Sequence, residues 1–239
     1  MESSIAVMEV VEYSKEDNRT WSILFARQMQ MIKGKVCDEF IFGMQKLKLD
    51  PNKVPLIEET SSRLQKLGGW KLAKAEQAYL TDVQWASHFA KRQFPVTNYI
   101  RKPHEIDFTP LPDVAHDYFG HLAFLAVPHY MEIVELFSEV YKLTPAEKMK
   151  ESAQLWWNTM EFGLIKQNGE IKLLGAGLIS SEKECRQCLD EKRHIPFTLE
   201  AAKSRPKAEE NVHETYLAIE SWEQLRNALK QHIRDLKGL

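Results

Sequence analysis

Apolar residues recur at helical spacing along most of the chain. Between residues 17 and 47 they stand three or four positions apart, with charged and amide side chains between them. This predicts an amphipathic helix, or two helices with a break near Gly34. Prolines, glycines and capping residues divide the rest of the chain into further segments. Helices are predicted over residues 56–67, 82–93, 113–126, 129–141, 145–163 and 221–236, and a capping box at Ser181 and Glu184 predicts one more.

Short runs of β-branched and aromatic residues interrupt this helical pattern and predict a few strands. Residues 70–75 and 94–100 are expected to be extended, and residues 215–219 alternate between apolar and polar side chains. Asn168-Gly169 lies between two apolar runs and predicts a hairpin turn. The expected fold class is therefore mainly α with short β-hairpins (α+β). The chain of 239 residues is predicted to form a single domain, with residues 1–15 as a loosely ordered lead-in.

Composition and charge narrow the function classes. Lys and Arg total 32 and Asp and Glu total 34, for a net charge of −2, so the chain lacks the positive charge typical of nucleic-acid binding. No apolar run approaches the length of a transmembrane helix, and the N-terminus lacks the features of a signal peptide. We expect a cytoplasmic protein with no nucleic-acid or membrane partner. Two of the three cysteines form the pair Cys185-x2-Cys188, and they are expected to be reduced.

Two histidines and one glutamate form the strongest candidate site. His116 and His121 are five residues apart, and Glu161 follows forty residues later in an aromatic and apolar run. Two imidazoles and one carboxylate are the ligand set of non-heme Fe(II) oxygenases. On an ideal α-helix, however, residues five apart point about 140° away from each other. Both can bind one metal only if the turn is widened, as in a π-bulge, or the helix bends, and Gly120 is expected to give the backbone the freedom for it. The spacing alone leaves open that one histidine is a core residue and the other exposed.

The residues around these three side chains resemble a known family. The segment Pro110-x-Pro112-Asp113-x2-His116-Asp117-x-Phe119-Gly120-His121 is followed by Glu161-Phe162-Gly163-Leu164 and by Gly175-Ala176-Gly177-x2-Ser180-Ser181. Further matching segments occur in the same order: Trp21 with Arg27-Gln28, Leu67-x-Gly69-Trp70, Phe94-Pro95-Val96-Thr97, Tyr99-Ile100-Arg101-x-Pro103, Ile195-Pro196-Phe197 and Ser221-Trp222-Glu223-x-Leu225. Over about residues 13–230, the chain resembles the tetrahydropterin-dependent aromatic amino acid hydroxylases. It is most similar to their short bacterial members, the phenylalanine 4-hydroxylases.

This resemblance implies an enzyme, a non-heme Fe(II), tetrahydropterin-dependent monooxygenase that uses O2 to hydroxylate the ring of an aromatic amino acid. The expected reaction converts L-phenylalanine to L-tyrosine, on the catalytic-domain fold of the family. By their positions in the family's motifs, the iron ligands and catalytic residues would be His116, His121 and Glu161. The substrate-binding residues would be Arg101, Thr109, Asp113, Trp157 and Ser180, and the pterin-binding residues Leu80, Trp85 and Asp117.

The resemblance also implies how the substrate is held. Arg101 would bind the carboxylate of the amino acid, a bidentate task that lysine performs poorly. Asp113 would support Arg101, although it could equally cap the helix that follows it. Thr109 and Ser180 would form hydrogen bonds around the bound amino acid. Trp157 would form an aromatic wall of the pocket, against the alternative of plain core packing.

Several positions depart from the family pattern. The loop over residues 75–80 lacks the family's glycine, Trp85 stands where the family stacks a phenylalanine on the pterin, and Trp156 replaces a tyrosine. These changes leave open an iron oxygenase on the same scaffold that acts on tryptophan or another aromatic substrate, with reduced or no pterin dependence. A non-catalytic binding module is a third alternative. We expect neither a regulatory domain nor a coiled-coil tetramer, and therefore a monomer, with a dimer as the alternative.

Overall fold

Helices dominate the computed structural model, which describes residues 12–77, 79–107, 109, 111–208 and 212–239. Residues 1–11 of the predicted lead-in lie outside this part of the chain, and the first helix begins at Lys15, capped by Ser14. In chain order the elements are α1 (Lys15–Ile32), α2 (Asp38–Leu47), α3 (Ile57–Gly68), β1 (Lys71–Lys74), α4 (Asp82–Ala90), β2 (Gln93–Val96), η1 (Pro103–Glu105), η2 (Ala115–Leu122), η3 (Phe124–Ala126), α5 (Pro128–Leu143), η4 (Ala146–Lys148), α6 (Met149–Trp156), η5 (Trp157–Glu161), β3 (Leu164–Gln167), β4 (Glu170–Leu173), α7 (Ala176–Ser180), α8 (Glu182–Gln187), η6 (Glu191–Arg193), β5 (His194–Pro196), α9 (Leu199–Ser204), β6 (Tyr216–Ile219) and α10 (Trp222–Lys237).

Local sequence signals explain most of the helix boundaries. The break predicted near Gly34 separates α1 from α2, and Gly34 has a φ of 74°, which glycine adopts without strain. Thr81 and Gln84 form a capping box at the start of α4. The box predicted at Ser181 is only half present. The Ser181 hydroxyl accepts a hydrogen bond from the backbone of Glu184, but the Glu184 carboxylate points to other partners, described below.

The strands form two small sheets. β1 and β2 pair in parallel, and a four-stranded sheet has the order β4-β3-β6-β5. Within that sheet only β3 and β4 are antiparallel. They are joined by the predicted turn at Asn168 and Gly169, whose φ values of 54° and 82° are those that a tight two-residue hairpin requires. In the part of the chain that the structure describes, the fold is mainly α with one short hairpin, and the other strand pairs are parallel.

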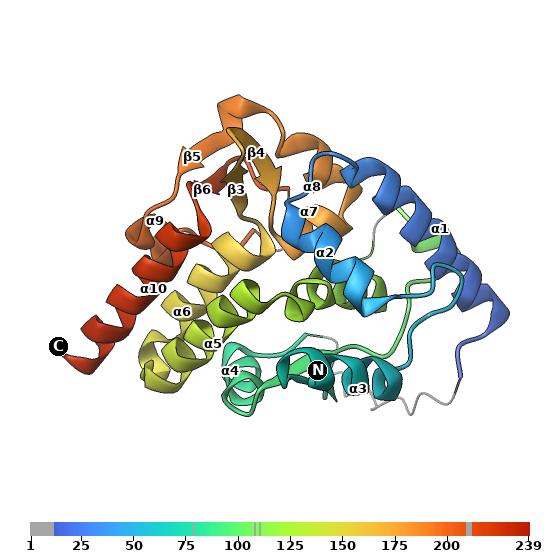
Figure 1. Cartoon of the computed structure of the whole chain (residues 1–239), viewed down its shortest axis with the longest axis horizontal. Helices are drawn as coiled ribbons and strands as arrows, with labels where there is room; N and C mark the ends of the chain where they lie inside the picture. Colours follow the sequence, from blue (N-terminus) through green and yellow to red (C-terminus); the bar gives the residue numbers. More distant parts are fainter. Residues whose placement is uncertain (1–11, 78, 108, 110, 209–211) are drawn as a thin grey trace, which may run out of the picture.

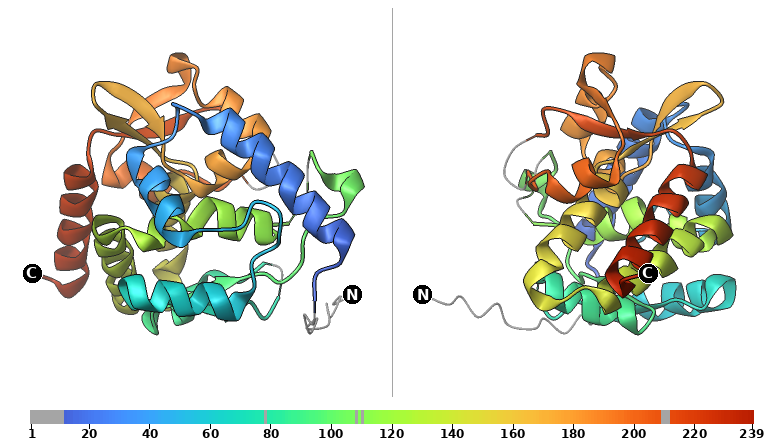
Figure 2. Two further views of the ribbon diagram at one scale, coloured as in Figure 1. Left: turned by 45° about the vertical axis from the view of Figure 1, so that its right-hand side comes forward. Right: turned by 90° about the vertical axis from the view of Figure 1, so that its left-hand side faces the viewer.

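One continuous hydrophobic core runs through the described elements and surrounds η2. In Figure 1 the four-stranded sheet lies at the top, α3 and α4 at the bottom, and η2 crosses the middle. α10 packs on the outer side of α5, as the further views also show (Figure 2). Because η2 is enclosed by α1, α7 and η3, its side chains are held in fixed positions at the centre of the molecule.

Candidate metal centre and its pocket

Both segments that carry the candidate metal ligands are π-helices. His116 and His121 lie on η2, and Glu161 ends η5. In a π-helix the backbone hydrogen bonds run between residues five apart, so each turn is wider than in an α-helix. This geometry brings the two imidazoles together, with 3.2 Å between their Nε2 atoms. Of the widened turn or bend that the sequence spacing requires, the widened turn is therefore present, and the reading of one buried and one exposed histidine is wrong.

Gly120 permits close packing rather than an unusual backbone conformation. Its φ is not positive, so the freedom expected of it is not used. A Cβ atom at this position would instead lie 3.0 Å from the carbonyl oxygen and 3.1 Å from the Cβ of Ala176. Glycine at position 120 lets η2 lie directly against α7, the helix that carries Ser180.

The three candidate ligands have the spacing of a metal site. Glu161 Oε1 lies 3.1 Å from Nε2 of His121, and Glu161 Oε2 lies 3.7 Å from Nε2 of His116. Metal–ligand bonds of about 2.1 Å that meet at right angles place neighbouring ligand atoms about 3 Å apart. Among the described residues this is the only cluster of three His, Cys, Asp or Glu side chains that could hold a metal. The donor set therefore fits an iron ion with open positions on the cavity side.

The protonation states also suit a metal. Burial, together with the neighbouring His121, lowers the pKa of His116 to about 4. Burial opposes the ionised form of Glu161, but His121, His116 and the hydrogen bond from Trp156 outweigh it and lower its pKa to about 2. At neutral pH His116 is uncharged and Glu161 is ionised, which are the forms that bind a metal.

Ser180 fixes the orientation of His116. The Ser180 hydroxyl donates to the carbonyl of Ala176 at 2.8 Å, so it must accept from Nδ1–H of His116, also at 2.8 Å. That tautomer leaves the lone pair of His116 on Nε2, the atom that faces Glu161. Such a partner behind a histidine ligand holds its ring in place. The family pattern assigns Ser180 to the substrate, and the structure adds this contact with His116.

Trp156 holds Glu161 in the same way, a role that the sequence did not reveal. Its indole Nε1–H donates to Oε1 of Glu161 at 2.8 Å. The indole is buried, and its ring lies 6.3 Å from that of His121 in a stacked orientation. Trp156, which stands where the family has a tyrosine, is therefore a direct hydrogen-bond partner of the candidate ligand Glu161.

Arg101 and Asp113 form a buried ion pair. Nε and Nη2 of Arg101 donate to the two Asp113 oxygens at 2.8 and 2.9 Å. Asp113 also accepts from the backbone N–H of His116 at 3.2 Å, so it supports Arg101 and caps η2 at once. Nη1 of Arg101 has no hydrogen-bond partner among the described residues. The edge of the guanidinium that carries Nη1 thus stays available to a carboxylate.

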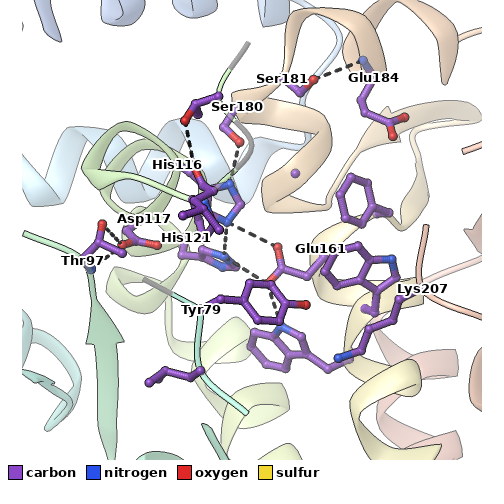
Figure 3. Close-up of a pocket in the computed structure, with 18 of the residues that line it drawn as sticks. Tyr79, Thr97, His116, Asp117, His121, Glu161, Ser180, Ser181, Glu184 and Lys207 are labelled. Carbon is purple, nitrogen blue, oxygen red and sulfur yellow. Dashed lines mark hydrogen bonds and ion pairs between the residues drawn. The ribbon is translucent and has the colours of Figure 1, made fainter. Parts of the chain in front are cut away.

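A cavity of about 680 Å³ joins these groups. Every predicted site residue lines it except Asp113, which is fully buried behind Arg101. Figure 3 shows His116, His121 and Glu161 pointing toward one another at this cavity. Thr109 lies at the cavity and donates to the carbonyl of Leu111 at 3.2 Å.

The three residues predicted to bind pterin, Leu80, Trp85 and Asp117, all line the cavity. Asp117 accepts from the backbone and hydroxyl of Thr97 at 2.6 and 2.8 Å. Burial raises the pKa of Asp117 to about 6, although these hydrogen bonds oppose the rise. Trp85 packs against Phe89 and Phe94, and Leu80 lies just before its helix. Trp85 is thus part of the aromatic core as well as of the cavity.

Trp157 forms another part of the cavity wall. Its ring packs 4.8 Å from that of Phe162, and its indole N–H donates to Nε2 of His213 at 3.0 Å. The Lys207 ammonium lies 5.6 Å above the Trp157 ring and pairs with Asp82 at 2.8 Å. Lys207 and His213 were not predicted, because they lie in a charged stretch without a recognisable motif.

Three features together define a class of protein. They are the two π-helices, the group of two imidazoles and a carboxylate, and the buried guanidinium beside the cavity. They are the features of a non-heme iron oxygenase for a small carboxylate substrate.

Comparison with known proteins identifies the family within this class. Residues 4–238 match the family described as biopterin-dependent aromatic amino acid hydroxylase, and the chain belongs to this family. Phenylalanine-4-hydroxylase of Chromobacterium violaceum is 34% identical over 90% of this chain and 73% of its own length. The enzyme of the same name from Caulobacter vibrioides is 31% identical over 90% of this chain and 74% of its own.

Solved structures agree with this assignment. The Chromobacterium violaceum enzyme with bound Fe(III) is 33% identical, with a TM-score of 0.87 over 94% of this chain and 82% of that one. Its complex with iron(III) and 7,8-dihydrobiopterin has a TM-score of 0.86 at 32% identity, over 95% of this chain and 83% of that one. Phenylalanine hydroxylase of Legionella pneumophila is 29% identical, with a TM-score of 0.86 over 96% of this chain and 93% of that one. The predicted family and fold class are confirmed. In the described part of the chain, no helix has the length and apolar character needed to cross a membrane.

Proposed function

We propose that this protein is an iron- and tetrahydropterin-dependent phenylalanine 4-hydroxylase. Phenylalanine, O2 and the tetrahydropterin would be converted to tyrosine and a hydroxylated pterin, with one oxygen atom entering each product. The observation that carries the proposal is the convergence of His116, His121 and Glu161 on one cavity with Arg101. The relatives named above as phenylalanine-4-hydroxylases support the choice of substrate.

His116, His121 and Glu161 would hold the iron and leave its remaining positions open to the cavity. When bound, the iron activates O2 with two electrons from the pterin, and this is the chemistry that the cofactors supply. The protein's contribution is to hold the metal ligands and the substrate in position. Ser180 and Trp156 keep two of the ligands oriented before the metal arrives, so little reorganisation is needed on binding.

Arg101 would bind the carboxylate of phenylalanine through the edge that Asp113 leaves free. Thr109 and Ser180 would form hydrogen bonds near the backbone end of the amino acid. Trp157 would contact the ring of phenylalanine, and the apolar lining would exclude water from the reacting carbon. Elsewhere on the lining, Leu80, Trp85 and Asp117 would contact the pterin.

The remaining parts of the proposal concern the whole chain. We infer a single catalytic domain over residues 1–239, a cytoplasmic location, and a monomer, with a dimer as the alternative. Light scattering on the purified protein decides between monomer and dimer. No nucleic-acid or membrane partner is expected.

One assay tests the proposal directly. Protein loaded anaerobically with Fe(II) is exposed to O2 with and without tetrahydropterin, in the presence of phenylalanine, tyrosine or tryptophan. Tyrosine formation from phenylalanine only with the pterin is the expected result. Turnover without pterin, or of tryptophan in preference, would favour the second candidate, an altered iron oxygenase. The substitutions at Trp85 and in the loop over residues 75–80 are the observation that motivates this candidate.

A further inference from the structure

Trp157 is connected to a network of buried polar side chains, in which Glu184 also lines the cavity whereas His213 and Tyr216 lie outside the lining. Its indole N–H donates to Nε2 of His213, and Nδ1 of His213 pairs with Oε1 of Glu184 at 2.8 Å. The Tyr216 hydroxyl donates to the other oxygen of Glu184. His213, Glu184 and Tyr216 are all less than 9% exposed. These hydrogen bonds link η5 to α8 and β6, which are far apart in sequence.

The donor and the acceptor of every hydrogen bond in this network of side chains are determined. An indole can only donate, so Nε2 of His213 must be the acceptor and carries no proton. The remaining proton lies on Nδ1, which donates to the carboxylate of Glu184. His213 is therefore a neutral imidazole with a single tautomer, and each of its ring nitrogens is used.

The buried carboxylate of Glu184 makes this arrangement rigid. Its Oε1 accepts from both the backbone N–H and Nδ1 of His213, at 3.1 and 2.8 Å. Neither Lys nor Arg pairs with Glu184 among the described residues. A buried charge that depends on three hydrogen bonds for its stability resists any rotation of His213, because rotation would remove one of them.

Ring contacts also hold the part of the cavity wall that Trp157 forms. The Phe162 ring lies 4.1 Å from that of His213 and 4.8 Å from that of Trp157. Rotation of the Trp157 indole would lose its hydrogen bond to His213 and disturb both ring contacts. The position of this wall is consequently set by His213 from behind, outside the surface that the substrate touches.

We propose that His213 is a positioning residue that determines which aromatic side chain the cavity accepts. With Glu184, it holds the indole of Trp157 in one orientation at the end of the cavity assigned to the substrate ring. Release of the wall would admit a larger indole ring and weaken the fit to phenylalanine. This inference rests on the proposed function, because it assigns the ring end of the substrate to Trp157.

A double-mutant cycle separates positioning from general stability. The ratio of kcat/KM for phenylalanine to that for tryptophan is measured for the wild type, His213→Phe, Trp157→Phe and the double variant. His213→Phe is expected to raise KM for phenylalanine about tenfold, with kcat changed less than about threefold, and to lower the ratio. In the Trp157→Phe background, the same change should leave the ratio unaltered.

Two further variants serve as rescue and control. His213→Gln, whose amide can accept from the indole and donate to Glu184, should recover most of the ratio. His232→Phe replaces another buried histidine, outside the cavity lining on α10, and should change neither KM nor the ratio. If His213→Phe does not fold, Glu184→Gln takes its place in the cycle and should lower the ratio only when Trp157 is present.

Equal effects of His213→Phe in both backgrounds, or an unchanged ratio in the Trp157 background, would overturn the inference. Dissociation constants of phenylalanine and tryptophan, measured by calorimetry on the iron-loaded protein, provide the same cycle without turnover. A wild type that binds phenylalanine but does not hydroxylate it would contradict the proposed function alone. An additive binding cycle would contradict the positioning role alone.

Discussion

Trp156 and Arg101 show how single side chains prepare this site before any ligand arrives. Trp156 donates to Glu161 from within the aromatic core, and Arg101 is held along one edge of its guanidinium by Asp113. Both contacts join a group that faces the cavity to a partner that is buried. Preorganisation of this kind reduces the free-energy cost of ordering side chains when metal or substrate binds.

Replacement of Trp156 by phenylalanine is expected to weaken metal binding about tenfold, because Glu161 loses the donor that orients it. Titration of the metal-free protein with Co(II), followed by absorption spectroscopy, measures the affinity. Trp70→Phe is a matched control, since Trp70 also donates to a carboxylate, that of Glu135 at 3.0 Å, but lies outside the cavity lining. Equal affinities for Trp156→Phe and the wild type would show that this hydrogen bond does not position the ligand.

Arg101→Lys is expected to raise KM for phenylalanine at least about tenfold while leaving the iron content unchanged. An ammonium cannot donate to both oxygens of Asp113 and also present a fixed edge to the substrate. Steady-state kinetics and elemental analysis measure the two quantities. Arg92→Lys, at an exposed pair with Glu135, serves as the control. A substrate KM that is unaffected by Arg101→Lys would remove Arg101 from the proposed substrate contacts.

Residue identities were predictable from the sequence only where a motif carried them. His116, His121, Glu161 and Arg101 belong to recognisable segments, and the structure brings them to one cavity. His213 and the donor role of Trp156 could not be found in this way. Their contacts are set by the packing of distant segments and leave no pattern in the local sequence.

At the scale of elements, the two π-helices are what make the site possible. The five-residue spacing of the histidines required either a widened turn or a bend to bring both to one metal, and η2 has the widened turn. The second π-helix, η5, was predicted as part of an ordinary helix through residue 163, because no comparable pair of residues revealed it. Hairpin signals are local, and the turn at Asn168 was read correctly. The parallel pairings of β1 with β2 and of β6 with its neighbours join distant segments, which sequence periodicity does not specify.

The contact between η2 and α7 gives a prediction at this scale. Gly120→Ala would place a methyl group against the backbone of Ala176, and overpacking of this kind costs about 1–3 kcal/mol. The expected fall in Tm is about 2–12 °C, together with weaker metal binding, because His121 adjoins the displaced residue. Thermal unfolding followed by circular dichroism measures the change. Ala176→Gly in the same chain should recover part of the loss; no fall in Tm would contradict the close packing.

For the whole molecule, the metal would connect elements that are distant in sequence. η2 and η5 both lie within the continuous core, so a metal that binds only the folded state should stabilise the entire chain. At a free metal concentration about one hundred times Kd, the gain is about 2.7 kcal/mol, which corresponds to a rise in Tm of about 5–10 °C. Thermal unfolding with and without Fe(II) under anaerobic conditions measures it, and Glu161→Gln should abolish most of the rise. An identical rise in that variant would locate the stabilising metal elsewhere.

The central claim is that His116, His121 and Glu161 hold the iron that the reaction requires. The most direct test is the iron content of protein loaded anaerobically with Fe(II) and freed of excess metal, measured by elemental analysis. The wild type should retain about one iron per chain, whereas His116→Ala and Glu161→Ala should retain almost none, because two ligands do not hold a ferrous ion with open positions. Wild-type iron content in both variants would contradict the assignment of the site.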